Sequence, residues 1–262
     1  MKEIEDKIFR SKNRTEKVYN NFKVQKDFED WHLATLSDLY SDLGYYFLIK
    51  NDLTKSKISF STGAYIDMYL TRNYNKSHSR FLEFDIPRGL FPVFTDNKPM
   101  IDMYSKLHYQ KSENAELSMD EMVLQGESAV WCNTIQFFMA NDNEGIERNL
   151  NIIETLTLPK LPKNQQELKI DYEFYKALLS KDKSKCEELL EQLVSSKIHK
   201  KRNDNAVLSK YVSQPALGYA KLAWRQGLEV EVNSPLIPKE ILPIEPLDNY
   251  EIPYDFLKEE FS

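Results

Sequence analysis

The sequence is poor in glycine, which accounts for only 7 of its 262 residues, whereas about 7% is typical of globular proteins. Glycine supplies the positive-φ turns and close backbone approaches that nucleotide-binding loops require. No two of these glycines lie within eight residues of each other. The chain therefore contains no Gly-rich dinucleotide loop, no P-loop and no Gly-x-Ser-x-Gly nucleophile elbow.

Cysteine and long apolar runs are equally scarce. The two cysteines, Cys132 and Cys186, lie far apart and neither belongs to a C-x-x-C pair. We interpret both as buried structural thiols, with a disulfide or a catalytic nucleophile as the alternatives. No stretch approaches the 18 uninterrupted apolar residues that suggest a membrane span. Met1–Asp6 is charged and lacks the apolar segment of a secretory signal, so we expect a cytoplasmic protein without a membrane partner.

No metal-ligand spacing connects the four histidines, which are His32, His78, His108 and His199. Neither H-x-x-x-H nor H-E-x-x-H occurs, and no cysteine lies near any of them. We interpret His32, on the apolar stripe of its helix, as a core histidine. The sequence therefore predicts no metal and no cofactor.

The sequence also lacks the groups of neighbouring residues that nucleophilic and acid–base catalysis usually require. Cys132 is expected in mid-helix, away from the helix N-terminus that would lower its pKa. Ser61 and Ser128 have no base nearby in the sequence. Acids such as Glu121 and Glu127 are interpreted as parts of solvated helix faces. We therefore predict that the protein is not an enzyme.

Charge is distributed unevenly along the chain. Residues 229–262 contain nine acidic residues and two lysines, while the whole chain carries −6. A small basic patch, at residues 197–210, lies just upstream. Duplex binding requires a broad cationic face that releases counterions. We therefore expect no nucleic-acid partner.

Most of the chain shows the 3.6-residue period of amphipathic helices. Ile58, Thr62, Tyr65 and Tyr69 form one such stripe. Ser118-Met119-Asp120-Glu121 is a capping box that predicts a helix over 119–140, and Asp142 can cap the next helix. Strict alternation is nearly absent, and the best strand candidate, residues 228–232, could equally be an extended loop.

The apolar positions after residue 167 predict two helices joined by a very short turn near Lys181-Asp182, and such helices must pack as an antiparallel hairpin. We therefore predict an all-α fold, either a helical bundle or a loose stack of antiparallel helix pairs. The expected organisation is one domain, 1–262, with a possible division into 1–158 and 163–262 at the proline-containing break. Prolines between residues 235 and 253 predict an extended C-terminal arm that ends in a short helix at 254–261.

Two segments are candidate partner-binding surfaces. Residues 82–94 are aromatic and interrupted by prolines, and they are either a buried crossing segment or a partly exposed platform with Arg88 and Phe91 as contacts. The acidic arm is either a solvated tail or an electrostatic capture surface for a basic partner. Its regularly spaced apolar residues indicate that it packs down. Its candidate contacts are Asp248, Tyr250, Glu251 and Asp255.

Residues 213–238 resemble the end of the immunity protein 49 family of bacterial polymorphic-toxin systems. The resemblance is carried by a small-residue helix, the sequence Gly-Leu-Glu-Val at 227–230 and Ser-Pro-Leu-Ile-Pro at 234–238. It extends over roughly 167–238, although Lys181 stands where the family pattern suggests glycine. The tail at 249–255 is also similar to the acidic, tyrosine-rich ends of immunity proteins against PoNe-type DNases.

The resemblance implies a cytosolic, non-catalytic inhibitor that binds a cognate antibacterial toxin, for example a nuclease delivered by a secretion system. The alternatives are a helical adaptor or scaffold unrelated to toxins and an enzyme whose acids converge in three dimensions. The sequence leaves the oligomeric state open. No residue is assigned to the toxin contact by the resemblance.

Overall fold

The computed structural model describes residues 2–24, 30–74, 80–111, 116–203 and 205–261. Throughout these ranges the chain forms helices and connecting loops, with no β-strand. The prediction of an all-α fold is therefore confirmed. None of the helices in the described ranges is long and apolar enough to cross a membrane.

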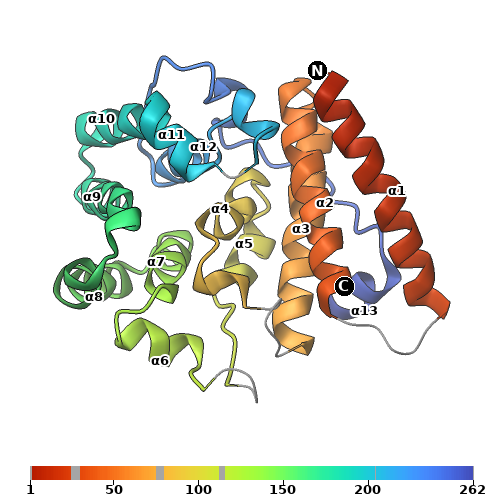
Figure 1. Cartoon of the computed structure of the whole chain (residues 1–262), viewed down its shortest axis with the longest axis horizontal. Coiled ribbons are helices and arrows are strands. Elements are labelled where there is room, and N and C mark those ends of the chain that lie inside the picture. The colour runs from red at the N-terminus through yellow and green to blue at the C-terminus, as the bar shows by residue number, and fades with distance from the viewer. Residues whose placement is uncertain (1, 25–29, 75–79, 112–115, 204, 262) are drawn as a thin grey trace.

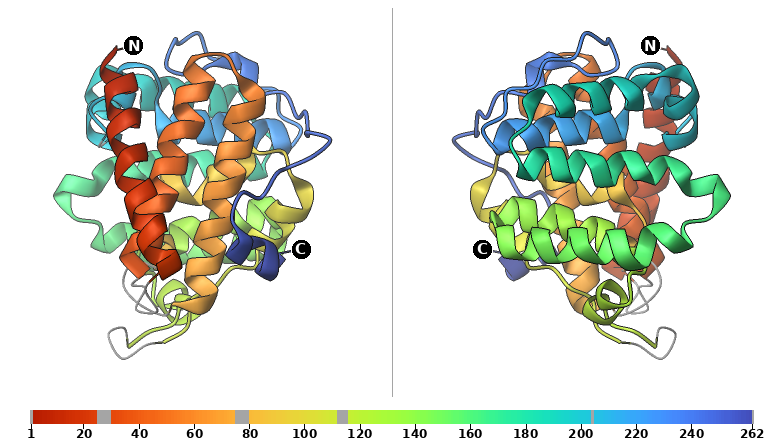
Figure 2. Two further views of the ribbon diagram at one scale, coloured as in Figure 1. Left: turned by 90° about the vertical axis from the view of Figure 1, so that its right-hand side faces the viewer. Right: turned by 90° about the vertical axis from the view of Figure 1, so that its left-hand side faces the viewer.

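Three long helices form one side of the molecule (Figures 1 and 2). They are α1 (Lys2–Val24), α2 (Asp30–Ile49) and α3 (Leu53–Asn73). A tight turn reverses the chain between α2 and α3, where Asn51 has a φ of 59° and the Asp52 carboxylate accepts the backbone N–H of Lys55. Because this connection is so short, the two helices pack antiparallel along their length.

The other side is a stack of shorter helices that run across the direction of α1–α3 (Figure 2). Its main members are α7 (Ala129–Ala140), α8 (Asn143–Ile152), α9 (Lys169–Leu179), α10 (Lys183–Val194) and α12 (Gln214–Arg225). Short helices border or connect them, namely α5 (Lys98–Tyr104), α6 (Met119–Leu124) and α11 (Ser196–Arg202). The remaining connections include single turns at Ile153–Thr157, Leu158–Lys160, Lys163–Leu168, Leu208–Lys210 and Lys239–Ile241.

The proline-interrupted segment 81–94 crosses between the two sides as three short turns, η2 (Phe81–Glu83), α4 (Ile86–Gly89) and η3 (Phe91–Phe94). Phe94 is fully buried, and its ring centroid lies 4.8 Å from that of Phe60 on α3. The segment is therefore a buried crossing segment rather than an exposed platform. Phe84 is the exception, with 68% of its surface exposed.

The single helix predicted over 119–140 is divided into two helices in the structure. The capping box at Ser118 and Glu121 is present, but α6 ends at Leu124 and α7 begins at Ala129. Gly126 lies between them with a φ of 71°, a conformation that α-helices exclude. The prediction of one continuous helix over 119–140 was therefore wrong. The apolar residues keep the same helical period on both sides of the turn, and Gly126 is the sequence feature that marks the break.

The predicted helix hairpin is confirmed as α9 and α10. Lys181 has a φ of 59° in the turn between them, which explains why glycine would suit this position. Asp182 then caps α10 by accepting the backbone N–H of Lys185. Asp142 caps α8 in the same way.

Helix α12 packs closely through its small residues, and its N-terminal capping hydrogen bond comes from another segment of the chain. Ser213 occupies the N-cap position without a side-chain capping hydrogen bond. The side-chain oxygen of Asn203 accepts the backbone N–H of Gln214 instead, at 2.8 Å. Gly227 follows the end of the helix in the left-handed region, with a φ of 78°, a conformation that favours glycine there.

The chain after Gly227 is an extended arm without a strand, buried at Val230, Ile237 and Ile241. It ends in α13 (Asp255–Phe261), which lies against α3. The rings of Tyr65 and Phe261 are 5.0 Å apart between centroids. The arm therefore packs onto the fold at these buried positions and through α13, whereas Ile244 between them is 43% exposed.

Gly218 tests the close packing of α12 against the crossing segment. A Cβ at this position would lie 2.5 Å from the Cδ1 atom of Leu90, which is fully buried. Because the buried Leu90 side chain cannot move aside without displacing other core side chains, Gly218→Ala should destabilise the fold by about 1–3 kcal/mol. Urea unfolding of the purified variant measures this change.

Gly63→Ala in α3 is the matched control. The added Cβ would lie 3.5 Å from the Cβ of Tyr40, which is an ordinary contact. Since alanine favours a helix interior, this variant should be more stable by about 0.4–1 kcal/mol. Equal losses of stability in both variants would contradict the packing account.

Candidate functional site

The acidic arm is held by a buried cluster of charges around Asp96. This residue lies between η3 and α5 with a φ of 58°, and its side chain is fully buried. Its carboxylate is 3.0 Å from Nζ of Lys57 on α3 and 2.8 Å from Nζ of Lys221 on α12. Nη1 of Arg225 lies 3.6 Å away. Three cations therefore share one carboxylate in the interior.

Backbone groups of the arm complete this cluster. Nζ of Lys221 donates to the carbonyl oxygens of Ile241 and Pro243, at 2.7 and 2.8 Å. Lys57 donates to the carbonyl of Glu245, and the Glu245 N–H donates to Asp96 at 3.1 Å. Carbonyl oxygens carry partial negative charge, so the arm offsets the excess positive charge of the cluster.

The predicted arm contacts divide into one anchor and three exposed acids. Tyr250 is half-buried, and its hydroxyl donates to the carbonyl oxygen of Thr95. Asp248, Glu251 and Asp255 are exposed. The arm therefore presents its acids from a backbone that is tied to the core.

Lys221 is the most desolvated cation of the cluster. Burial is the main reason why its pKa falls from 10.5 to about 8, and the attraction of Asp96 opposes this shift. The neighbouring charges of Lys57 and Arg225 lower the pKa further. The Lys221 ammonium group therefore loses its proton at a lower pH than that of an exposed lysine.

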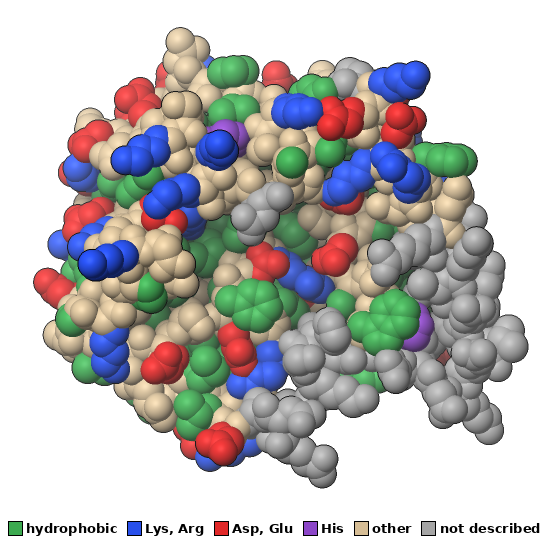
Figure 3. Space-filling model, in the orientation of Figure 1, with side chains coloured by type: hydrophobic (Ala, Val, Ile, Leu, Met, Phe, Trp, Pro, Cys, Tyr) green, Lys and Arg blue, Asp and Glu red, His purple; other side chains and the backbone are tan. Residues whose placement is uncertain are grey.

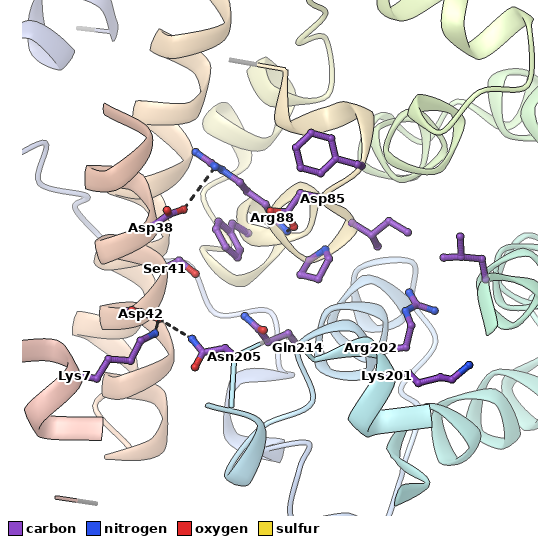
Figure 4. A pocket seen from close by; sticks show the side chains of 15 residues that line it. Lys7, Asp38, Ser41, Asp42, Asp85, Arg88, Lys201, Arg202, Asn205 and Gln214 are labelled. Carbon is purple, nitrogen blue, oxygen red and sulfur yellow. Dashed lines mark hydrogen bonds and ion pairs between the residues drawn. The ribbon is translucent and has the colours of Figure 1, made fainter. Parts of the chain in front are cut away.

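A second candidate surface is a hollow of about 610 Å³ in the middle of the face shown in Figure 3. Acidic and basic side chains gather around it from α1, α2, α4 and α11, as the close view shows (Figure 4). The labelled side chains include Lys7, Asp38, Asp42, Asp85, Arg88, Lys201 and Arg202.

Arg88 forms part of the wall of this hollow and is only 7% exposed. Its Nε lies 2.9 Å from an Asp67 carboxylate oxygen, and the hydroxyl of Ser37 donates to Asp67 at 2.6 Å. Its Nη1 faces Asp38 at 3.7 Å. Because these contacts involve α2 and α3, Arg88 fastens α4 to the long helices. Phe91, which also lines the hollow, is 5% exposed.

Arg202 holds the opposite wall. Its two terminal nitrogens bind the two carboxylate oxygens of fully buried Asp171, at 2.5 and 2.8 Å. The Tyr219 hydroxyl donates to Asp171 and lies 2.9 Å from the hydroxyl of Tyr175. This network fixes α11 against α9 and α12, since charge-assisted bidentate pairs have strict geometry.

The structure separates the predicted contacts into two groups. Arg88 and Phe91 belong to the hollow on the face of Figure 1, whereas the arm runs behind α3 and α12 on the other side (Figures 1 and 2). Asp38 and Asp42, which also line the hollow, were absent from the sequence prediction, whereas Phe84 lies inside the candidate segment 82–94 but was not one of its named contacts. The helical spacing of Asp38 and Asp42 could have indicated a shared polar face, but not what lies opposite it.

The described residues contain no group of three or more His, Cys, Asp or Glu side chains that could hold a metal ion. Both cysteines are buried and free, and burial raises the pKa of Cys186 to about 12. His32 is half-buried, with its ring 3.6 Å from that of Trp31. His78 lies outside the described residues.

A family model described as Immunity protein 49 matches residues 98–241, which is more than half of the chain. The match runs from α5 through α12 to the first part of the arm. It includes the segment 213–238 on which the sequence resemblance rests. No curated protein and no solved structure matches the chain.

The depressed pKa of Lys221 predicts a specific pH dependence of stability. Between about pH 8 and pH 10 the unfolded chain binds more protons at this lysine than the native state does, so its contribution to stability increases with pH. Lys221→Met removes the titration and keeps an apolar stem. The free energy of unfolding of the natural protein, relative to this variant, should rise by about 1 kcal/mol per pH unit.

Urea unfolding of both proteins at pH 7.5, 8.5 and 9.5 measures this difference. Cysteines and tyrosines of the unfolded chain also titrate in or near this range, but they are present in both proteins, so their contributions cancel in the comparison. A difference that stays constant over this range would show that Lys221 keeps an ordinary pKa.

Proposed function

Because the chain belongs to the immunity protein 49 family, we propose that it neutralises a cognate antibacterial toxin in the cytoplasm by binding it tightly. The protein performs no catalysis in this proposal. The family membership is the observation that carries it. The family description names no target, so the toxin is specified only as the protein that this chain neutralises.

The rigid presentation of charge supports a binding role. The exposed acids Asp248, Glu251 and Asp255 project from an arm whose backbone is fixed by Lys57 and Lys221. Charges that are held in place before association cost less conformational entropy when they meet a partner. The arm therefore favours a partner with a basic surface, such as a nuclease with a cationic active-site cleft.

Co-expression tests this function directly. The protein encoded by a toxin-like reading frame immediately upstream should arrest the growth of a bacterial host, and the present chain should restore growth and co-purify with it. The control is Gly218→Ala, whose lower stability should reduce rescue in proportion to the folded fraction. Failure of the natural chain both to rescue and to co-purify would favour the adaptor role instead.

The acidic arm should act mainly on the rate of association. Reversing Asp248, Glu251 and Asp255 to Lys replaces attraction of a basic partner by repulsion. The association rate constant should fall by about tenfold or more at low ionic strength and much less at 0.5 M salt. Surface plasmon resonance with the co-purified toxin measures both rate constants.

The control is a second triple reversal, Glu144→Lys, Glu147→Lys and Glu191→Lys, at exposed positions on α8 and α10. It changes the net charge equally but leaves the arm intact. If both triple variants slow association to the same extent, net charge rather than the arm would guide the toxin.

A further inference from the structure

The hollow beside Arg88 continues into a second hollow and forms one groove with it. The second hollow has a volume of about 440 Å³. Phe84, Ile86, Leu168 and Arg202 line both. The groove therefore extends across the face of Figure 3, from α2 at one end to the turns around Pro162 at the other.

The two ends of the groove differ in chemistry. The first is bordered by the carboxylates of Asp38, Asp42 and Asp85. The second has an apolar part formed by side chains such as those of Trp131 and Leu161, with polar side chains such as Glu127 and Gln165 beside them. A ligand that fills both hollows must therefore combine a polar group and an apolar group.

The cations of the first hollow are already paired. Arg88 is bound to Asp67, and Arg202 to Asp171. Lys7 lies 2.5 Å from Asp42, and Lys201 lies 3.3 Å from Glu167. These pairs leave little positive charge to attract an anion.

Asp38 is the carboxylate with capacity for a further partner. Its side chain is 73% exposed, and it faces Arg88 at 3.7 Å, longer than a hydrogen bond. Asp85 lines the same hollow and uses one oxygen to cap α4, accepting the backbone N–H of Arg88 at 3.0 Å. The charge that complements this end of the groove is therefore positive.

Phe84 stands where the two hollows meet and is 68% exposed. An aromatic ring at the rim of a groove binds the aliphatic stem of a long side chain and attracts its cationic end. Exposed aromatic rings are also frequent among residues that dominate binding energy at interfaces. This position therefore suits an arginine or lysine that enters from outside.

The groove is preformed, because buried ion pairs fix both of its walls. Arg88, Asp67 and Ser37 connect α4 with α2 and α3, while Arg202, Asp171 and Tyr219 connect α11 with α9 and α12. A partner would not need to order these walls on binding, so little of its interaction energy would be lost.

We propose that this groove is the docking site for a segment of the toxin that carries a basic side chain followed by an apolar one. The basic group enters the first hollow beside Asp38 and Phe84, and the apolar group fills the second beside Trp131. The inference rests on the proposed function and adds a contact on the face opposite the arm. Contacts in the groove determine the dissociation rate constant of the complex, whereas the acidic arm determines the association rate constant.

The double variant Asp38→Asn/Phe84→Ser tests the groove. Both side chains are largely exposed, so the melting temperature should stay unchanged. The dissociation rate of the toxin that co-purifies with the natural chain should rise tenfold or more, with little change in the association rate.

The matched control is Asp120→Asn/Phe9→Ser. Asp120 has a 69% exposed side chain and Phe9 is 66% exposed, and neither lines the groove. Its dissociation rate should stay within about twofold of that of the natural chain. Equal rates for the groove variant and the natural chain would overturn the groove while leaving toxin binding intact. Loss of binding by the natural chain itself would overturn the proposed function, and the groove with it.

Phe84→Trp gives a second measurement that does not depend on weakened binding. The new indole reports on its own surroundings, and its fluorescence should shift to shorter wavelength when the toxin covers it. The natural chain, with its three native tryptophans, provides the background spectrum. A variant that binds the toxin without this additional shift would place the contact elsewhere and overturn the proposal.

Discussion

The ionic cluster at Asp96 is the interaction on which the arrangement of the molecule depends. One buried carboxylate meets Lys57 of α3 and both Lys221 and Arg225 of α12, so it joins the long helices to the helix stack. The excess positive charge requires further acceptors, and the arm supplies them as carbonyl oxygens. Loss of one partner from such a cluster costs about 3–5 kcal/mol, because a charge then remains buried without compensation.

Buried carboxylates that pair with cations are also found at both walls of the groove. Asp67 and Asp171 are fully buried carboxylates, and each binds an arginine from a short helix. Buried ion pairs contribute little net stability compared with apolar packing, but they tolerate only one geometry. Their effect here is to fix where α4 and α11 lie, and thus the shape of the surface between them.

The local features of the fold were predictable where they depend on near neighbours in the sequence. The cap at Asp142, the capping box at Ser118 and the short turn near Asp182 could be predicted, because each depends on residues a few positions away. The turn at Gly126 could not, because the apolar period on both sides of it matches a single helix. The acid at Asp38 was also missed, since its importance comes from Arg88 and Phe84, which lie more than forty residues away.

The sequence alone determined that the chain is helical, that residues 213–238 resemble one family, and that the arm is acidic and packs down. These properties follow from periodicity, local capping and composition, which need no knowledge of the partner elements. Only the tertiary structure decided that Arg88 is a buried wall residue, that the arm and the groove face opposite sides, and that Phe84 is exposed. These properties depend on which segments pack together over long sequence distances. A buried carboxylate such as that of Asp96 can pair with its cations only when the helices that carry them are packed against each other.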